Sequence, residues 1–186
     1  NAIITAIEIH PDSTNKLFVG GYRLHKSNDW GNSWELSYSP QNTPNSIKDI
    51  VISKHNPQIV YFGTTISWQN YGLYKSSNGG NSWNKMSNPG QIISIAIHPN
   101  YTNTLFVSTL SDIKISYDSG VTFQNIGQHI PSNNMSKLIT IPDDPLYLFA
   151  GTKDKGVYYT NNSGQTWHLL QGEYNPRITD IDVLIS

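Results

Sequence analysis

SNDWGNSW, which runs from Ser27 to Trp34, is the stretch that decides the fold, because it returns three more times along the chain. SSNGGNSW begins at Ser76, SYDSGVTF at Ser116 and TNNSGQTW at Thr160, so all four fit the pattern [ST]-x-[DN]-x-G-x-[ST]-[WF]. Their starts are 49, 40 and 44 residues apart. A period of about 40–50 residues is typical of propeller blades with four strands each.

Two strand patterns precede each of these boxes at a constant phase. An Ile-rich run comes first, at residues 4–9, 47–52, 92–97 and 136–141, and a β-rich run that ends in small residues follows at 17–22, 59–65, 105–109 and 146–152. Proline marks the turn between the two runs at Pro11, Pro57, Pro99 and Pro142. An alternating strand before the box and another from its aromatic residue complete four strands per repeat. We therefore predict an all-β propeller of four-stranded antiparallel blades.

The residue types of the box suit a tight turn between the third and fourth strands of a repeat. An Asp or Asn side chain accepts hydrogen bonds from the amides ahead of it, and glycine takes the positive φ that a tight reversal requires. The aromatic residue covers the sheet and buries a large apolar area. We therefore predict a structural role for the box residues, which are Ser27, Asp29, Gly31, Trp34, Ser76, Asn78, Gly80, Trp83, Ser116, Asp118, Gly120, Phe123, Thr160, Asn162, Gly164 and Trp167.

The repeats divide a single propeller into four blades, at about residues 1–45, 46–90, 91–134 and 135–176. Residues 177–186 begin a fifth repeat, because ITDIDV at 178–183 has the Ile-rich pattern again. An unpaired strand edge is a liability, so we expect this strand to pair with further blades of the same parent chain or with a second chain. A parent ring of six to eight blades is expected, and a compact four-bladed ring is the alternative.

Composition excludes several classes of partner. The 186 residues carry 12 basic and 13 acidic side chains, a net charge of −1, which leaves no basic surface for nucleic acid or anionic membranes. No apolar run approaches the roughly 18 residues of a membrane-spanning helix. There is no cysteine, and the histidines and acids lack metal-ligand spacing. We predict no metal and no cofactor.

The four boxes resemble the Asp-box, also called the bacterial neuraminidase repeat, over essentially the whole chain. Such blades occur in sialidases, xyloglucan-cleaving glycoside hydrolases, sortilin-type receptors and photosystem II assembly factors, and one box per blade is most similar to the last three. The resemblance implies boxes remote from the functional face and does not select an activity. Sialidases need three arginines, whereas only Arg23 and Arg177 occur here. The family is mostly extracellular or lumenal, which implies an extracellular or cell-surface location, although the chain shows no signal peptide.

The antiparallel strand order sorts the connections onto two ends of each blade. Boxes and proline-marked turns share one end, and the variable loops share the other, where function is expected. Variable loops lie at 65–71, 109–113, 153–155, 40–46, 88–91, 129–135 and 171–177. We predict ligand binding by an aromatic and cationic set that can stack on a sugar ring or anchor a protein: Trp68, Tyr71, Tyr174 and Arg177. Packing against a neighbouring blade is the alternative for Trp68.

Asp49 and Asp180 are the candidate catalytic pair, a low-ranking alternative to a chain without catalytic residues. Both take the third position of an Ile-rich run, where the other repeats are read as having Ala6, Ser94 and Leu138. Glycoside hydrolysis needs two carboxylates about 5–5.5 Å apart for retention or about 6.5–9.5 Å apart for inversion. Residues 177–181 are faintly similar to an Arg-Thr-Asp-Ile motif of xyloglucanases, with Ile178 inserted and the following glycines missing. Solvated carboxylates or turn caps are the competing interpretation.

These observations lead us to expect an extracellular or cell-surface Asp-box propeller module that binds a glycan or protein through its variable-loop face. A polysaccharide-cleaving glycoside hydrolase of the xyloglucanase type is one alternative. A purely structural propeller segment of a larger surface assembly is the other. Paired acids that face each other across a groove would favour the hydrolase.

Overall fold

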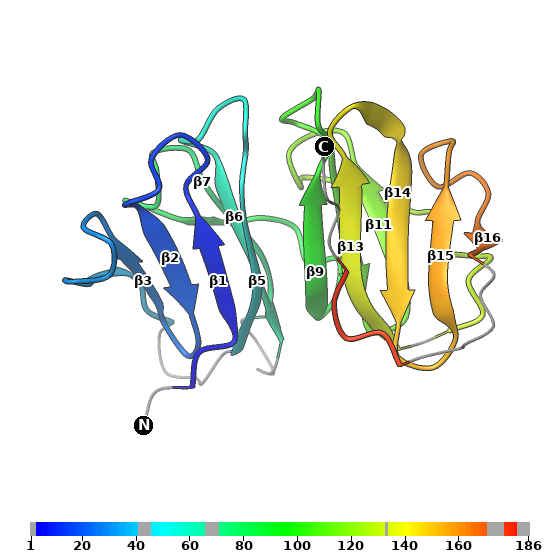
Figure 1. Ribbon diagram of the computed structural model, residues 1–186, viewed down its shortest axis with the longest axis horizontal. Helices are drawn as coiled ribbons and strands as arrows, with labels where there is room; N and C mark the ends of the chain where they lie inside the picture. Colours follow the sequence, from blue (N-terminus) through cyan, green and yellow to red (C-terminus); the bar gives the residue numbers. More distant parts are fainter. Residues whose placement is uncertain (1–2, 41–45, 66–70, 133, 171–176, 182–186) are drawn as a thin grey trace. The chain divides into compact units, whose positions relative to one another are not determined.

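The structure is a computed structural model that describes residues 3–40, 46–65, 71–132, 134–170 and 177–181. These residues form four antiparallel four-stranded sheets and no helix (Figure 1), so none of them forms a helix that could cross a membrane. The strands are β1 (Ala6–Ile9), β2 (Leu17–Gly20), β3 (Leu24–Ser27), β4 (Glu35–Tyr38), β5 (Ser46–Ile52), β6 (Val60–Thr65), β7 (Gly72–Ser76), β8 (Asn84–Lys85), β9 (Ile92–Ile97), β10 (Leu105–Thr109), β11 (Ile113–Ser116), β12 (Gln124–Asn125), β13 (Met135–Ile141), β14 (Asp144–Thr152), β15 (Gly156–Thr160) and β16 (His168–Leu169). Each sheet pairs its strands in chain order, which confirms the predicted all-β fold.

The chain forms two compact units, residues 1–92 and 93–186. Unit 1 holds the first two sheets, and the side chains between them form one core: Phe18, Leu24, Ile47, Ile50, Ile52, Val60, Phe62 and Tyr74. Unit 2 holds the last two sheets, whose core includes Phe106, Ile113, Ile115, Leu138, Leu148, Tyr158 and Trp167. Alternation along the strands supplies these apolar faces.

A bulge early in two of the Ile-rich strands sets which residues face the preceding sheet. The ladder shifts between Ile47 and Asp49 in β5 and between Met135 and Lys137 in β13. One inserted residue turns side chains three positions apart to the same face, so Ile47 and Ile50 are both buried.

The strand pairing also corrects which residues are equivalent at the third position of the Ile-rich runs. Asp49 pairs with Gly63, and Lys137 pairs with Gly151 in the same way. Lys137, not Leu138, is therefore the counterpart of Asp49. The same bulge precedes both residues, so Met135 and not Ser136 is the counterpart of Ile47, and the match begins one residue earlier than the Ile-rich pattern indicates.

In the box turns the glycine of the pattern has the predicted positive φ, and the residue before it has a positive φ as well. Two consecutive residues adopt positive φ in each: Trp30–Gly31, Gly79–Gly80, Ser119–Gly120 and Ser163–Gly164, with φ between 55° and 92°. Two left-handed residues in a row make a type I′ turn, the reversal whose twist suits an antiparallel pair. Side-chain hydrogen bonds then close the turn.

The polar side chains of a box bond within their own turn, as the third box illustrates. Ser116 Oγ accepts the Gly120 N–H at 2.8 Å and donates to Asp118 Oδ1 at 2.8 Å. Asp118 Oδ1 accepts the Thr122 N–H at 2.8 Å, and Thr122 Oγ1 donates to Asp118 Oδ2 at 2.6 Å. In the third box, Ser116, Asp118 and Thr122 therefore bond to one another and to backbone amides of their own turn.

Asparagine replaces aspartate in the second and fourth boxes by reversing one hydrogen bond. Asn78 Nδ2 donates to Ser82 Oγ at 2.9 Å, and Asn162 Nδ2 donates to Thr166 Oγ1 at 2.8 Å. A hydroxyl can donate or accept, so the turn closes with either residue.

The boxed tryptophans connect a sheet to the one before it. Trp83 Nε1 donates to Ser37 Oγ at 3.1 Å in unit 1. Trp167 Nε1 donates to the Ile126 carbonyl at 2.7 Å in unit 2. Each pair of sheets is thus joined by an aromatic ring that is also hydrogen-bonded.

The predicted fifth repeat has the packing of an Ile-rich strand, although residues 177–181 form no strand. The Ile178 N–H donates to the Thr152 carbonyl at 3.2 Å. A Cβ placed on Gly151 would lie 2.8 Å from Ile178 Cγ2 and 2.9 Å from Ile181 Cδ1. Residues 182–186 of this repeat lie outside the described residues.

Candidate functional site

The two ends of each unit differ in the way the repeat predicts. In unit 2, β13 and β15 run toward the β13–β14 and box turns, and β14 runs back toward the β14–β15 turn (Figure 1). The box end repeats from sheet to sheet. The opposite end carries the loops that vary.

A polar hollow of about 660 Å³ lies at the variable end of unit 2. Two variable loops line it, the connection before β13 and the β14–β15 turn. We call it the loop hollow, and its lining residues are Ile130, Pro131, Ser132, Asn134 and Asp154.

Side-chain and backbone hydrogen bonds pin these two loops to each other. Ser132 Oγ donates to Asp154 Oδ1 at 2.6 Å and accepts the Asn134 N–H at 3.1 Å. The Lys153 N–H donates to the Asn134 carbonyl at 2.9 Å. Ser132 is buried while Asp154 is exposed, so the buried hydroxyl positions a carboxylate at the surface.

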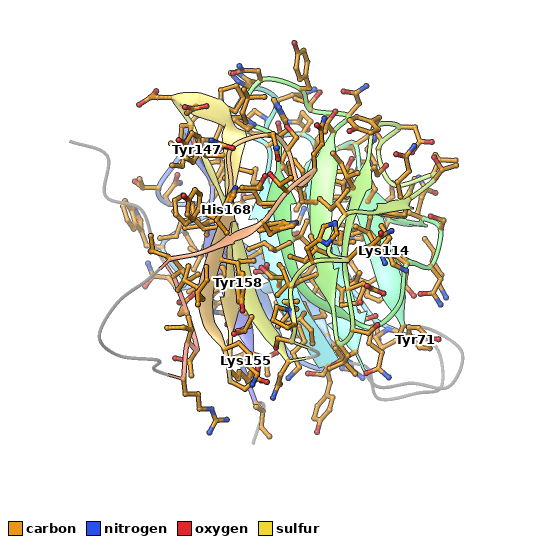
Figure 2. The ribbon with its side chains drawn as sticks, turned by 90° about the vertical axis from the view of Figure 1, so that its right-hand side faces the viewer. Tyr71, Lys114, Tyr147, Lys155, Tyr158 and His168 are labelled. Atoms are coloured by element: carbon orange, nitrogen blue, oxygen red, sulfur yellow. The ribbon has the colours of Figure 1, made fainter. Side chains whose placement is uncertain are left out.

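The β14–β15 turn is hydrogen-bonded on its other side as well. Thr152 Oγ1 donates to the Gly156 carbonyl at 2.8 Å and accepts the Lys155 N–H at 2.9 Å. Figure 2 shows Lys155 at the end of the fourth sheet, below Tyr158. Burial raises the pKa of the Tyr158 phenol, and the negative charge of Asp154 raises it further. The residues that line the hollow therefore offer a hydroxyl, an amide and one carboxylate.

The four predicted ligand-binding residues are only partly placed. Trp68 and Tyr174 lie outside the described residues. Tyr71 is half-buried just before β7. Arg177 is exposed, and its neighbour Ile178 bonds to Thr152 at the end of β14, so Arg177 lies beside the turn that carries Asp154.

The two candidate catalytic acids belong to different units, and their pairing stays a prediction. Asp49 is 7% exposed in β5 of unit 1. Asp180 is exposed in unit 2, and its carboxylate accepts the Ile181 N–H at 3.0 Å. Neither unit contains both acids. Among the described residues, no three His, Asp or Glu side chains cluster in a way that could hold a metal ion.

A row of aromatic side chains on the fourth sheet was not singled out from the sequence. Ring centroids lie 6.4 Å apart for Tyr147 and Phe149, 6.1 Å for Phe149 and Tyr159, and 5.4 Å for Tyr159 and His168. Figure 2 labels Tyr147 and His168 on this sheet. Aligning the repeats strand by strand finds the row, because the matching positions of the first sheet hold Lys16, Phe18, Lys26 and Glu35.

A second hollow, of about 370 Å³, lies at the box end of unit 1. Lys26 Nζ lies 3.1 Å from Glu35 Oε1 and donates to Asn81 Oδ1 at 2.5 Å across it. Lys26 is thus held by Glu35 and Asn81. This hollow lies among repeated elements, so we do not assign recognition to it.

Comparison with known proteins supports the propeller assignment. No family model matches the chain. A curated xyloglucanase from Hypocrea jecorina is 34% identical over 91 residues, which cover 47% of this chain and 11% of that protein. An ancestral GH74 enzyme matches 94% of this chain and 25% of its own with a TM-score of 0.76 at 19% identity. YCF48 bound to D1 peptide matches 94% of this chain and 55% of its own with a TM-score of 0.67 at 16% identity.

These similarities establish the fold and reach no further. The chain spans about a tenth of the curated xyloglucanase and a quarter of the GH74 structure. The structural identities are too low to carry function. The class defined here is a β-propeller built of four-stranded antiparallel blades.

Proposed function

We propose that this chain is a propeller module that binds a glycan at the variable-loop end of its blades, with the loop hollow as a contact site. The observation that carries the proposal is the 2.6 Å bond by which buried Ser132 holds the exposed carboxylate of Asp154. Recognition in rigid scaffolds is concentrated in loops that the scaffold positions. Here two variable loops fix each other around a hollow.

The groups of the hollow suit a neutral ligand rich in hydroxyls. One oxygen of Asp154 accepts from Ser132, and the second oxygen of a carboxylate can accept from a sugar hydroxyl. The side-chain amide of Asn134 can both donate and accept. Pro131 supplies exposed apolar surface for the C–H face of a sugar ring. The similarity to a xyloglucanase makes xyloglucan oligosaccharides the first ligands to test.

The same proposal assigns the protein to the cell surface or the extracellular space, where polysaccharides are met. A composition of 20 Asn and 21 Ser with only 13% charged residues supports this location. A surface that is polar through amides and hydroxyls is suited to neutral partners. Protein recognition is the competing mode, as in the YCF48 structure with its peptide.

Calorimetric titration of the intact chain with xyloglucan oligosaccharides tests the proposal. Asp154→Ala should lower the affinity at least about tenfold, because it removes a charged acceptor from the contact surface. Asp144→Ala is the matched control, since Asp144 begins β14 at the box end and Asp154 follows the other end of that strand. The affinity of this variant should equal that of the wild type. Maltooligosaccharides provide the comparison ligand.

Two outcomes would contradict glycan binding at the loop hollow. A wild-type chain that binds no neutral oligosaccharide would remove the proposed ligand class and favour a protein partner or a purely structural role. An Asp154→Ala chain with unchanged affinity would move the site elsewhere.

A glycoside hydrolase is the second candidate function, favoured by the 34% identity to a xyloglucanase over 91 residues. A binding module releases no reducing ends from xyloglucan during prolonged incubation. If the wild type releases reducing ends, the variants Asp49→Asn and Asp180→Asn should be compared with it. Loss of this activity in each variant, with binding retained, would establish the hydrolase and assign the two acids to catalysis.

A further inference from the structure

One face of the first sheet is exposed, although the equivalent face of the second sheet is buried. We call the face turned toward the preceding sheet the leading face and the opposite one the trailing face. On the leading face of the first sheet Ile4, Ile7 and Ile9 are 54%, 62% and 56% exposed. The isoleucines at the same repeat positions of the second sheet are at most 6% exposed, and they are Ile47, Ile50 and Ile52.

The strand ladders establish this equivalence. Ala6 pairs with Gly20 as Asp49 pairs with Gly63, and Ile7 and Ile50 each follow directly. Ile7 and Ile50 therefore occupy the same place in their blades. Ile50 is buried because the first sheet packs against it, whereas no described sheet packs against Ile7 in this way.

The aromatic side chain of the first box is exposed as well. This observation is independent, because the box lies between β3 and β4 and not on β1. Trp34 is 42% exposed, whereas Trp167 of the fourth sheet is 8% exposed. Trp167 donates its Nε1–H to the preceding sheet, and no described residue accepts from Trp34. A Cβ on Gly31 would meet only Trp34 itself, whereas one on Gly164 would meet Ile126 of the preceding sheet.

The packing inside unit 1 shows what covers such a face. The trailing face of the first sheet offers Gly20, where a Cβ would lie 2.6 Å from Ile47 Cγ2. It offers Phe18 against Gly80, and Ser37 accepts from Trp83 Nε1. A fitting partner therefore presents a small residue, a large apolar residue and a hydrogen-bond acceptor in this arrangement.

Glycines on the trailing faces of this chain already meet isoleucines. Gly20 meets Ile47, and Gly63 meets Ile92. The third sheet is followed by the fourth within unit 2. The small residue of the fourth sheet, Gly151, is filled by Ile178 and Ile181, so it cannot also receive the isoleucines of β1.

We propose that the leading face of the first sheet docks the trailing face of a further box-bearing blade, one outside these four sheets. The docking partner is neither the fourth sheet of the same chain nor that of a second copy, because both have Gly151 filled. The contact repeats the one between the first and second sheets.

Thiol labelling tests this docking directly, because the chain has no cysteine of its own. Ile7→Cys places a single thiol on the leading face, and Ile50→Cys places one at the covered equivalent. A further blade is added by fusing a copy of residues 4–46 directly ahead of Ile4, which keeps the native spacing because Ile4 matches Ile47. The reaction rate with a maleimide is measured for the chain with and without the added blade.

We expect the thiol at position 7 to react quickly in the 186-residue chain at all protein concentrations. The added blade should slow it at least tenfold, and the thiol at position 50 should stay protected in both chains. A second fusion, with a copy of residues 92–134 in place of 4–46, keeps the test informative where the first added blade does not fold.

Three results would overturn the proposal. Protection of position 7 in the chain alone, independent of concentration, would mean that the fourth sheet covers it. Protection that disappears on dilution would mean that a second copy covers it. Fast reaction in both fusions, with position 50 still protected, would mean that no blade docks on this face.

Discussion

Gly20→Ala is the substitution that tests the packing between sheets most sharply. Gly20 lies in β2 at the point where Ile47 of the next sheet crosses it. Its φ is not among the positive ones, so alanine brings no backbone strain. Whatever the substitution costs therefore measures the closeness of the two sheets.

The contact distances set the magnitude. The new Cβ would lie 2.6 Å from Ile47 Cγ2, 3.0 Å from Ile47 Cβ and 3.1 Å from Ile50 Cδ1. Both isoleucines are buried and must move by several tenths of an ångström, and such overpacking costs about 1–3 kcal/mol. Alanine recovers about 0.4–1 kcal/mol by restricting the unfolded chain. We expect a net loss of about 1–2 kcal/mol in the free energy of unfolding.

Urea unfolding followed by circular dichroism measures this loss, and Ser108→Ala is the matched control. Ser108 occupies the position of Gly20 in the third sheet, so a Cβ is already accommodated there. Its Oγ is buried without a hydrogen-bond partner among the described residues. Removing an unpaired buried hydroxyl is neutral or stabilising.

A Gly20→Ala chain that is as stable as the wild type, or more stable, would refute the reasoning. It would mean that the two sheets are not in contact at Gly20. A Ser108→Ala chain that loses about as much stability as Gly20→Ala would also contradict it, because the cost would then not arise from the added Cβ.

Three further predictions concern the turns. Ser116→Ala should cost about 1–3 kcal/mol in urea unfolding, because the Gly120 N–H loses its acceptor in a buried place. Asp118→Asn should unfold at the same temperature as the wild type at pH 7, because Thr122 Oγ1 can turn from donor to acceptor as in the Asn boxes. Hydrogen bonds from Thr122 and Ser116 lower the pKa of Asp118 to about 2, so the wild type should lose stability as the pH falls from about 4 to 2, and the variant should lose less. Burial lowers the pKa of His98, so on acidification the unfolded state binds this proton before the folded state does. The free energy of unfolding should therefore fall as the pH drops below about 6.5. His98→Asn should make the unfolding temperature less dependent on pH in this range.

The sequence predicted the sheets well because each carries its own local signals. A box with glycine at the second left-handed position marks every turn between third and fourth strands, and alternation marks the strands. Positive φ at Trp30 was not foreseen, since nothing local in the sequence distinguishes it from the other variable positions. The side-chain hydrogen bonds of Asp29 and its partners make that conformation tolerable.

Packing between sheets and the contacts of the variable loops were predicted less well. Lys137 takes the position of Asp49 because Met135, and not Ser136, is the counterpart of Ile47, and the Ile-rich pattern does not show which residue begins the match. Ser132 and Asp154 are 22 residues apart. The sequence placed both residues in variable loops at the same end of the blades. It did not predict their hydrogen bond, because that bond depends on how the two loops fold beside each other.

Amide hydrogen exchange in the presence and absence of xyloglucan oligosaccharides tests the central claim most directly, namely that the boxes are structural and recognition lies at the opposite end. The account predicts added protection in residues 128–135 and 152–156, with no change in the box turns at 27–34, 76–83, 116–123 and 160–167. Protection confined to the box turns would contradict the account, and so would an exchange pattern that the oligosaccharides leave unchanged throughout the chain.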